Sequence, residues 1–149
     1  MIFLIDEEMT KHIGEKLGRL LKPNDVIALN GDLGAGKTLM TKSIAKSMGI
    51  EEYITSPTFT IVQEYEGILP LYHFDVYRIA DEEEMYYIGF EEYLSKGGVC
   101  IIEWASLIPN ILPKDRLEIE LSYAGDSGRN MKITAYGVRY EELAKELML

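Results

Sequence analysis

One glycine-rich segment constrains this chain more than any other part of its sequence. Residues 31–38 read Gly-Asp-Leu-Gly-Ala-Gly-Lys-Thr and satisfy the pattern G-x-x-x-x-G-K-[ST]. The glycines permit backbone angles that a Cβ would forbid, so backbone N–H groups can point inward at phosphate oxygens. Lys37 brings a cation to the β- and γ-phosphates, and the Thr38 hydroxyl can bind magnesium. The segment predicts a phosphate-binding P-loop, and we expect its ligand to be ATP with Mg²⁺.

The residues on either side of this loop have the patterns that a P-loop requires. Residues 26–29 (Val-Ile-Ala-Leu) form a continuous apolar run typical of a buried strand. Residues 38–48 predict a helix that ends at Gly49, and the positive end of that helix would face a bound phosphate. This order of strand, loop and helix favours a ligand-binding loop over a glycine-rich turn without a ligand.

The rest of the chain predicts an α/β fold. We expect an edge strand over residues 3–5, a helix over 10–21, a hairpin from 60–65 and 69–75, and a helix opening at 81–84. A buried strand over 98–102, a second hairpin from 116–123 and 131–136, and a helix over 141–147 follow. Together these elements predict a P-loop NTPase-like single domain over residues 1–149, with a mixed central sheet flanked by helices and a C-terminal hairpin.

The charge of the chain limits its partners. Its 25 acidic residues against 15 basic ones give a formal charge of −10. Binding to a nucleic-acid backbone requires clustered Lys and Arg, and no run of the sequence supplies them. A role in a nucleic-acid pathway would therefore act through a protein partner, with tRNA contacted only indirectly.

The sequence also favours a cytoplasmic location. No apolar run approaches the ~18 residues of a membrane helix, and the N-terminus lacks the basic region of a secretory signal. The single cysteine, Cys100, lies in an apolar run and reads as a core residue, which fits a reducing compartment.

Two acids at predicted strand ends are candidates to complete the site, because parallel sheets place ligands at the carboxyl ends of their strands. Glu103 ends the run 99–102 in the manner of a Walker B strand, with Trp104 beside it. Asp75 ends the run 69–74. Ser56-Pro57-Thr58-Phe59 forms a loop whose hydroxyls could sense a γ-phosphate, although a capped turn is nearly as good a reading. His73 could assist the chemistry, but a lone histidine on a strand is more often structural.

Four segments in combination resemble a known family. GDLGAGKT, SPTF, HFDVYR and EW, at these spacings, are similar to segments of the TsaE family (older name YjeE), small bacterial ATPases of tRNA threonylcarbamoyladenosine synthesis. The resemblance covers residues 24–108. GDLGAGKT alone indicates only a P-loop, whereas HFDVYR and EW make the resemblance specific.

The resemblance implies a role for particular residues. Thr38 and Glu103 would bind magnesium, and Asp75 would support hydrolysis together with Glu103 and Lys37. Further nucleotide contacts are implied for the loop and the following turn, for the switch-like loop, and for one residue near each end of the chain: Gly31, Asp32, Leu33, Gly34, Ala35, Gly36, Lys37, Thr38, Leu39, Thr58, Thr10 and Arg129. Thr10 would lie near the base. The implied partners are TsaD and TsaB, which transfer the threonylcarbamoyl group to tRNA. Tyr86, Tyr87 and Phe90 are candidates for exposed aromatic residues at a partner surface.

Three other functions fit a P-loop. A small-molecule kinase usually needs an arginine-bearing lid, and the arginines here are widely spaced with no lid insertion. A GTPase normally carries an Asn/Thr-Lys-x-Asp segment, which is absent from the sequence. A nucleotide-gated interaction module with negligible catalysis is not separated by sequence from a slow, partner-dependent ATPase.

Overall fold

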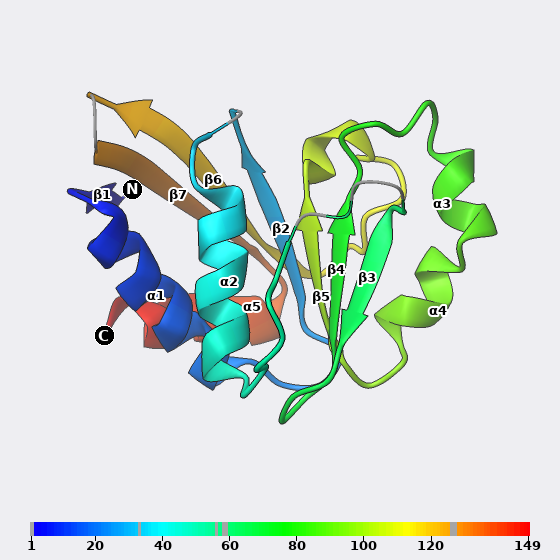
Figure 1. Cartoon of the computed structure of the whole chain (residues 1–149), viewed down its shortest axis with the longest axis horizontal. Helices are drawn as coiled ribbons and strands as arrows, with labels where there is room; N and C mark the ends of the chain where they lie inside the picture. The colour runs from blue at the N-terminus through cyan, green and yellow to red at the C-terminus, as the bar shows by residue number, and fades with distance from the viewer. Residues whose placement is uncertain (1, 33, 56, 58–59, 126–127) are drawn as a thin grey trace.

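The computed structural model describes residues 2–32, 34–55, 57, 60–125 and 128–149. A sheet of seven strands separates two helical layers (Figure 1). The strand order is β1-β7-β6-β2-β5-β4-β3. In chain order the strands are β1 (Ile2–Leu4), β2 (Val26–Gly31), β3 (Val62–Tyr65), β4 (Leu71–Asp75), β5 (Val99–Glu103), β6 (Arg116–Ala124) and β7 (Gly128–Tyr136).

The middle of the sheet is parallel and its edges are antiparallel. β2 pairs in parallel with β5 and β6, and β4 pairs in parallel with β5. The hairpins β3–β4 and β6–β7 and the pairing of β1 with β7 are antiparallel. The prediction of a mixed sheet with a late hairpin is confirmed. β2, β5 and β4 therefore end side by side at one edge of the sheet, where parallel strands place ligands.

Helices cover both faces of the sheet. The helices are α1 (Glu7–Leu20), α2 (Lys37–Ser47), α3 (Glu83–Tyr87), α4 (Phe90–Leu94) and α5 (Val138–Met148), with a 3₁₀ turn at Ala105–Leu107. Alternate residues of β2 belong to different cores. Ile27 and Leu29 pack in one cluster with residues of α1, α2 and α5, whereas Val26 and Ala28 pack in another with residues of α3 and α4. This alternation is what a strand buried on both faces requires. No helix in the described part of the chain is both long enough and apolar enough to cross a membrane.

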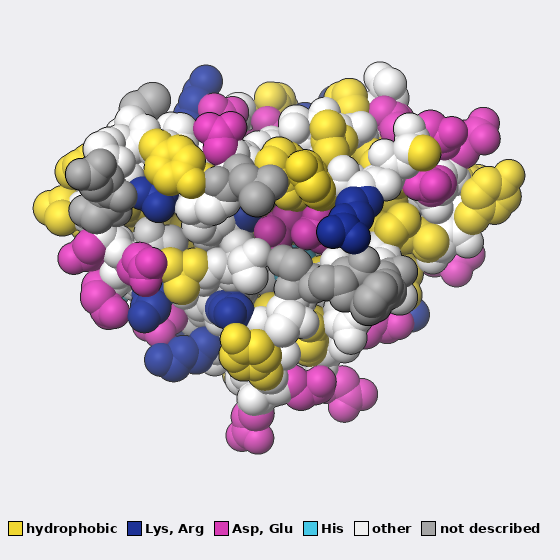
Figure 2. Space-filling model, turned by 45° about the horizontal axis from the view of Figure 1, so that its top comes forward, with side chains coloured by type: hydrophobic (Ala, Val, Ile, Leu, Met, Phe, Trp, Pro, Cys, Tyr) yellow, Lys and Arg dark blue, Asp and Glu magenta, His cyan; other side chains and the backbone are white. Residues whose placement is uncertain are grey.

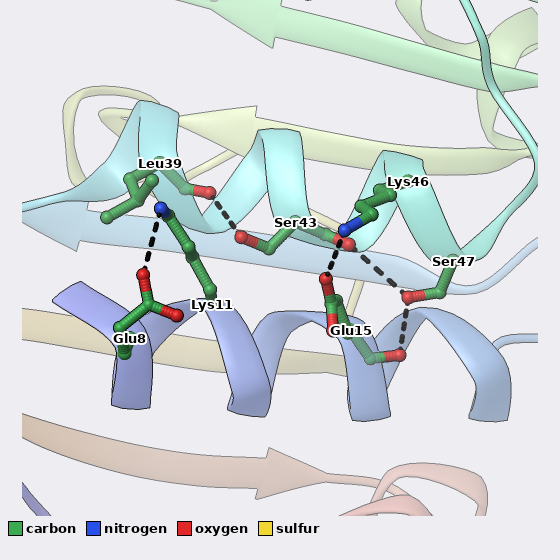
Figure 3. Close-up of polar contacts among 7 residues, drawn as sticks. All are labelled: Glu8, Lys11, Glu15, Leu39, Ser43, Lys46 and Ser47. Carbon is green, nitrogen blue, oxygen red and sulfur yellow. Dashed lines mark hydrogen bonds and ion pairs between the residues drawn. The ribbon is translucent and has the colours of Figure 1, made fainter.

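Helices α1 and α2 pack directly against each other through two glycines. A Cβ added at Gly14 would lie 2.6 Å from Ser43 Cβ, and one at Gly18 would overlap the Ile44 carbonyl oxygen. Polar contacts cross the same interface, as Figure 3 shows: Ser47 Oγ donates to the Glu15 carbonyl over 2.6 Å, and Lys46 forms an ion pair with the Glu15 carboxylate at 3.1 Å. Side chains larger than glycine would hold the two helices apart.

Several predicted boundaries differ from the structure for local reasons. α1 begins at Glu7 rather than at residue 10, because Asp6 accepts a hydrogen bond from the Met9 N–H over 3.0 Å and caps the helix. The helix predicted to open at 81–84 is the short α3, and Gly89, with φ 79°, separates it from α4. Phe90 begins α4 and is 2% exposed, so its prediction as an exposed partner residue is wrong. Tyr86 and Tyr87 are exposed as predicted.

Candidate nucleotide site

A cleft of about 890 Å³ lies at the edge where β2, β4 and β5 end. Figure 2 views this side of the molecule, with acidic side chains near its centre and basic side chains beside them. The lining residues come from the start of α1, the P-loop and first turn of α2, the ends of β4 and β5, and β7: Asp6, Glu7, Glu8, Thr10, Gly34, Ala35, Gly36, Lys37, Thr38, Leu39, Asp75, Tyr77, Arg78, Glu103, Trp104 and Arg129. Its position agrees with the sequence prediction of a strand-end site.

The P-loop curls around the lysine at the start of α2. Gly34 and Gly36 have φ angles of 78° and 109°, in the left-handed region that glycine tolerates best. Lys37 Nζ donates to the carbonyl oxygens of Gly31 and Asp32 over 2.6 and 2.8 Å. Gly31 and Asp32 thus contact the lysine but, unlike the later loop residues, do not line the cleft. These carbonyl oxygens hold the ammonium group beside the cleft, where a bound phosphate could contact it.

Trp104, the residue after β5, places its indole ring against the same lysine. Its φ of 63° is uncommon for a residue with a side chain, and Tyr77 packs against the indole at 4.6 Å between ring centroids. Lys37 Nζ lies 4.1 Å from the indole centroid, a cation–π distance. Burial lowers the pKa of Lys37, while the charges of the nearby acids Glu103, Asp75 and Asp32 oppose this shift. A phosphate bound beside Lys37 would add a further negative charge that favours the ammonium form.

The two predicted metal ligands lie together. Thr38 Oγ1 donates to Glu103 Oε1 over 3.3 Å. Among the described residues no group of three or more His, Cys, Asp or Glu side chains could hold a metal ion. A hydroxyl and one carboxylate are nevertheless the oxygen donors that Mg²⁺ accepts, since this ion commonly completes its shell with waters and substrate phosphates. The donor set fits magnesium bound together with a nucleotide.

Glu103 is buried at 2% exposure, and polar groups surround its carboxylate. His73 Nε2 lies 2.5 Å from Glu103 Oε2, and Thr41 Oγ1, which donates to the Lys37 carbonyl over 3.0 Å, lies 3.5 Å from the same oxygen. His73 is completely buried. The imidazole thus contacts a candidate metal ligand, and whether His73 assists the chemistry or is structural stays a prediction.

Asp75 lies next to Glu103 as its partner in the β4–β5 register. Burial raises the pKa of the Asp75 carboxyl, and the charge of Glu103 adds to this shift. A hydrogen bond of 3.1 Å from the Tyr77 N–H to Asp75 Oδ1 acts in the opposite direction on that pKa. A half-buried carboxyl with a raised pKa, in a cleft beside a lysine, has the surroundings of a functional acid.

The two site residues predicted near the chain ends also reach the cleft. Thr10 is buried in α1 and lines it. Arg129 donates from Nε to the Ala35 carbonyl over 3.2 Å and from Nη2 to the Gly34 carbonyl over 3.4 Å, and its guanidinium lies 4.5 Å from the Tyr123 ring centroid. Arg129 therefore joins the β6–β7 hairpin to the P-loop.

Leu33 and Thr58, also predicted to contact the nucleotide, lie outside the described residues. Sequence reasoning missed the contributions of Thr41, Tyr77 and Arg78. Tyr77 and Arg78 belong to the HFDVYR segment, and Thr41 follows Thr38 by one helical turn, so both signals were present in the sequence. The spacing of the arginines did not reveal that Arg78 and Arg129 line the same cleft.

Known proteins with similar sequences agree on one family. The model of "Threonylcarbamoyl adenosine biosynthesis protein TsaE" matches residues 4–131. The tRNA threonylcarbamoyladenosine biosynthesis protein TsaE of Bacillus subtilis is 50% identical over 144 residues, covering 96% of this chain and 90% of the relative. That of Treponema pallidum is 43% identical over 124 residues, covering 83% and 92%.

A solved structure extends the comparison to the fold. The crystal structure of Bacillus subtilis YdiB superposes with a TM-score of 0.83 at 45% sequence identity, covering 99% of this chain and 92% of that one. The family model spans the P-loop, both strand-end acids and Arg129. By its sequence, and by a fold and cleft that agree with that assignment, the chain belongs to the TsaE family.

Proposed function

We propose that this chain is a magnesium-dependent ATPase of the cytoplasm that supports threonylcarbamoyladenosine formation at position 37 of tRNA by the TsaD–TsaB complex. The contact of 3.3 Å between Thr38 Oγ1 and Glu103 Oε1 carries this proposal. It brings a P-loop hydroxyl and a strand-end carboxylate together at the N-terminus of α2, where the phosphates of a nucleotide would lie. Family membership supplies the pathway.

The residues of the chain divide the work of binding. Backbone N–H groups of the P-loop and of the N-terminus of α2 would bind the phosphates, and Lys37 would add a positive charge. Thr38 and Glu103 would hold Mg²⁺, which when bound neutralises phosphate charge. Thr10 and Arg129 also line the cleft, and the nucleoside would lie beside them.

Asp75 and Glu103 are the groups that would orient the attacking water. Both line the cleft, and they are register partners on neighbouring strands. Burial raises the pKa of Asp75, and a cleft carboxyl with a raised pKa has the surroundings of a functional acid. Trp104 and Tyr77 cover the phosphate end and would limit access of bulk water to it.

The proposed partners agree with the charge of the chain. A protein of formal charge −10 is repelled by the tRNA backbone, so its action on tRNA would pass through TsaD and TsaB. Arg129 donates to loop carbonyls rather than extending over the cleft, which argues against a kinase-type arginine lid at this position. The proposal includes slow hydrolysis by the isolated chain and faster hydrolysis in the presence of the partner proteins.

The test is the rate of ATP hydrolysis measured alone, with the TsaD–TsaB pair, and with free tRNA. The expected result is slow turnover alone, acceleration by the protein pair and no acceleration by tRNA. Asp75→Ala should bind nucleotide and partners but fail to sustain repeated rounds of tRNA modification. An unchanged rate with the pair, or efficient phosphorylation of a small metabolite, would contradict the proposal.

A further inference from the structure

The carboxylate of Glu103 has two oxygens in different surroundings. Oε1 accepts from Thr38 Oγ1, on the side of the cleft. Oε2 lies near His73 Nε2 at 2.5 Å and Thr41 Oγ1 at 3.5 Å. One oxygen is thus directed toward the proposed metal position and the other toward fixed protein groups.

His73 is suited to hold that second oxygen in place. It lies on β4, two residues before Asp75, and Asp75 is the register partner of Glu103, so the imidazole reaches the carboxylate across the strand pair. His73 is 0% exposed and Glu103 is 2% exposed, so bulk water does not reach this contact to compete with it. A glutamate side chain has several rotatable bonds, and a buried donor at its tip restricts it to one rotamer.

The other ring nitrogen of His73 indicates how the proton is placed. Nδ1 is buried and has no hydrogen-bond partner among the described residues. A carboxylate can only accept, so Nε2 carries the proton that it donates to Glu103. A neutral imidazole with its proton on Nε2 leaves a lone pair at Nδ1, whereas a second proton there would be a buried donor without an acceptor.

We infer that His73 is a positioning residue for magnesium: it fixes Oε2 of Glu103 so that Oε1 meets the ion beside Thr38. The inference rests on the proposed magnesium–nucleotide site. Groups that hydrogen-bond to metal ligands fix the orientation of those ligands, and losing one typically weakens metal affinity by about 10- to 100-fold. His73 itself contacts neither the ion nor the nucleotide.

Three substitutions separate positioning from packing. His73→Gln places an amide N–H₂ near the position of Nε2, His73→Asn carries the same amide on a shorter side chain, and His73→Leu fills the space without a donor. ADP affinity is measured by calorimetry in EDTA and across a Mg²⁺ titration. Thermal unfolding checks that each variant is folded, and the Gln–Asn pair decides the result if the leucine variant does not fold.

We expect the effect of Mg²⁺ on ADP affinity to weaken in the variants whose residue 73 side chain no longer donates to Glu103. His73→Asn and His73→Leu should require about tenfold or more Mg²⁺ to strengthen ADP binding, while His73→Gln stays within about threefold of the unmodified chain. Affinity in EDTA should be unchanged, because the phosphate contacts of Lys37 and the loop are untouched. In a Glu103→Gln background, substitution of His73 should cause no further loss of the Mg²⁺ response.

Each failure has a separate meaning. If the unmodified chain binds ADP equally well with and without Mg²⁺, the proposed magnesium site itself is wrong. If it responds to Mg²⁺ and all three variants respond equally, the positioning role of His73 is wrong. A further loss in the Glu103→Gln background would show that His73 acts other than through Glu103 and would also overturn the inference.

Discussion

The ammonium group of Lys37 lies 4.1 Å from the ring centroid of Trp104, so the P-loop cation and the residue after β5 contact each other directly. The chain has one tryptophan. Its emission therefore reports this contact without interference from other indoles.

Nucleotide binding should change the fluorescence of Trp104. A phosphate in the loop would draw Lys37 Nζ away from the indole and alter the local field. The measurement is an emission titration with MgADP, beside a calorimetric titration of the same sample. Lys37→Met, which replaces the lysine with an uncharged side chain of similar length, should lose most of the change at saturating nucleotide. Constant emission from a saturated protein would place Trp104 away from the bound phosphates.

Lys37→Ala should weaken ATP binding by about ten- to a hundredfold, because a charge-assisted contact contributes roughly 1.5–3 kcal/mol. Calorimetry on folded protein measures the change. Lys42→Ala, which removes a partly exposed lysine of the same helix that does not line the cleft, is the matched control and should bind normally. Equal affinity of the two variants would mean that the loop is not the nucleotide site.

Glu103→Gln should retain the fold and metal-free nucleotide binding but lose magnesium-dependent turnover. Glutamine keeps the size of the side chain and removes the charge that would hold the ion. The assay compares ATP hydrolysis in Mg²⁺ with ADP affinity in EDTA. Glu142→Gln, an exposed acid on α5, should behave as the unmodified chain does. Retained turnover in Glu103→Gln would shift the metal role to another acid.

Arg139→Ala should lower the free energy of unfolding by about 3 kcal/mol, because it leaves a buried carboxylate unpaired. Arg139 contacts both oxygens of Asp25 at 3.1 and 2.7 Å, and the Asp25 side chain is only 4% exposed. Urea unfolding measures the loss. Lys46→Ala removes a surface ion pair with Glu15 and should cost about 1 kcal/mol or less. Equal effects of the two substitutions would show that burial of Asp25 adds nothing.

Cys100 should resist thiol reagents in the folded protein at pH 8 and react once the chain is unfolded in urea. Burial raises the pKa of its thiol from 9.0 to about 12, so the reactive thiolate is scarce in the native state. Because the folded pKa is the higher one, this group stabilises the fold fully below pH ~9, and the contribution is lost as the pH rises toward 12. Rapid native labelling at pH 8, or the same alkaline loss of stability in Cys100→Ala, would contradict this expectation.

The parts of the structure that sequence predicted best depend on neighbouring residues in the chain. The strand before the P-loop, the loop itself and the helix after it follow from apolar runs and glycine spacing, and Glu103 and Asp75 could be placed at strand ends. The contact of His73 with Glu103 could not be predicted, because it depends on the register of β4 against β5. Phe90 was mistaken for a surface residue because its short helix gave too few positions to reveal which side faces the core.

Gly14 and Gly18 determine the spacing of two helices that line the cleft. They allow α1 to lie directly against α2, where larger side chains would separate the two helices. α1 carries Thr10 and α2 begins at Lys37, so the close packing of the two helices fixes the distance between these two lining residues. A ligand that displaced α2 on binding Lys37 would therefore also displace α1 and Thr10. We expect a ligand long enough to contact both Thr10 and Lys37 to bind with higher affinity than a fragment that contacts only one of them.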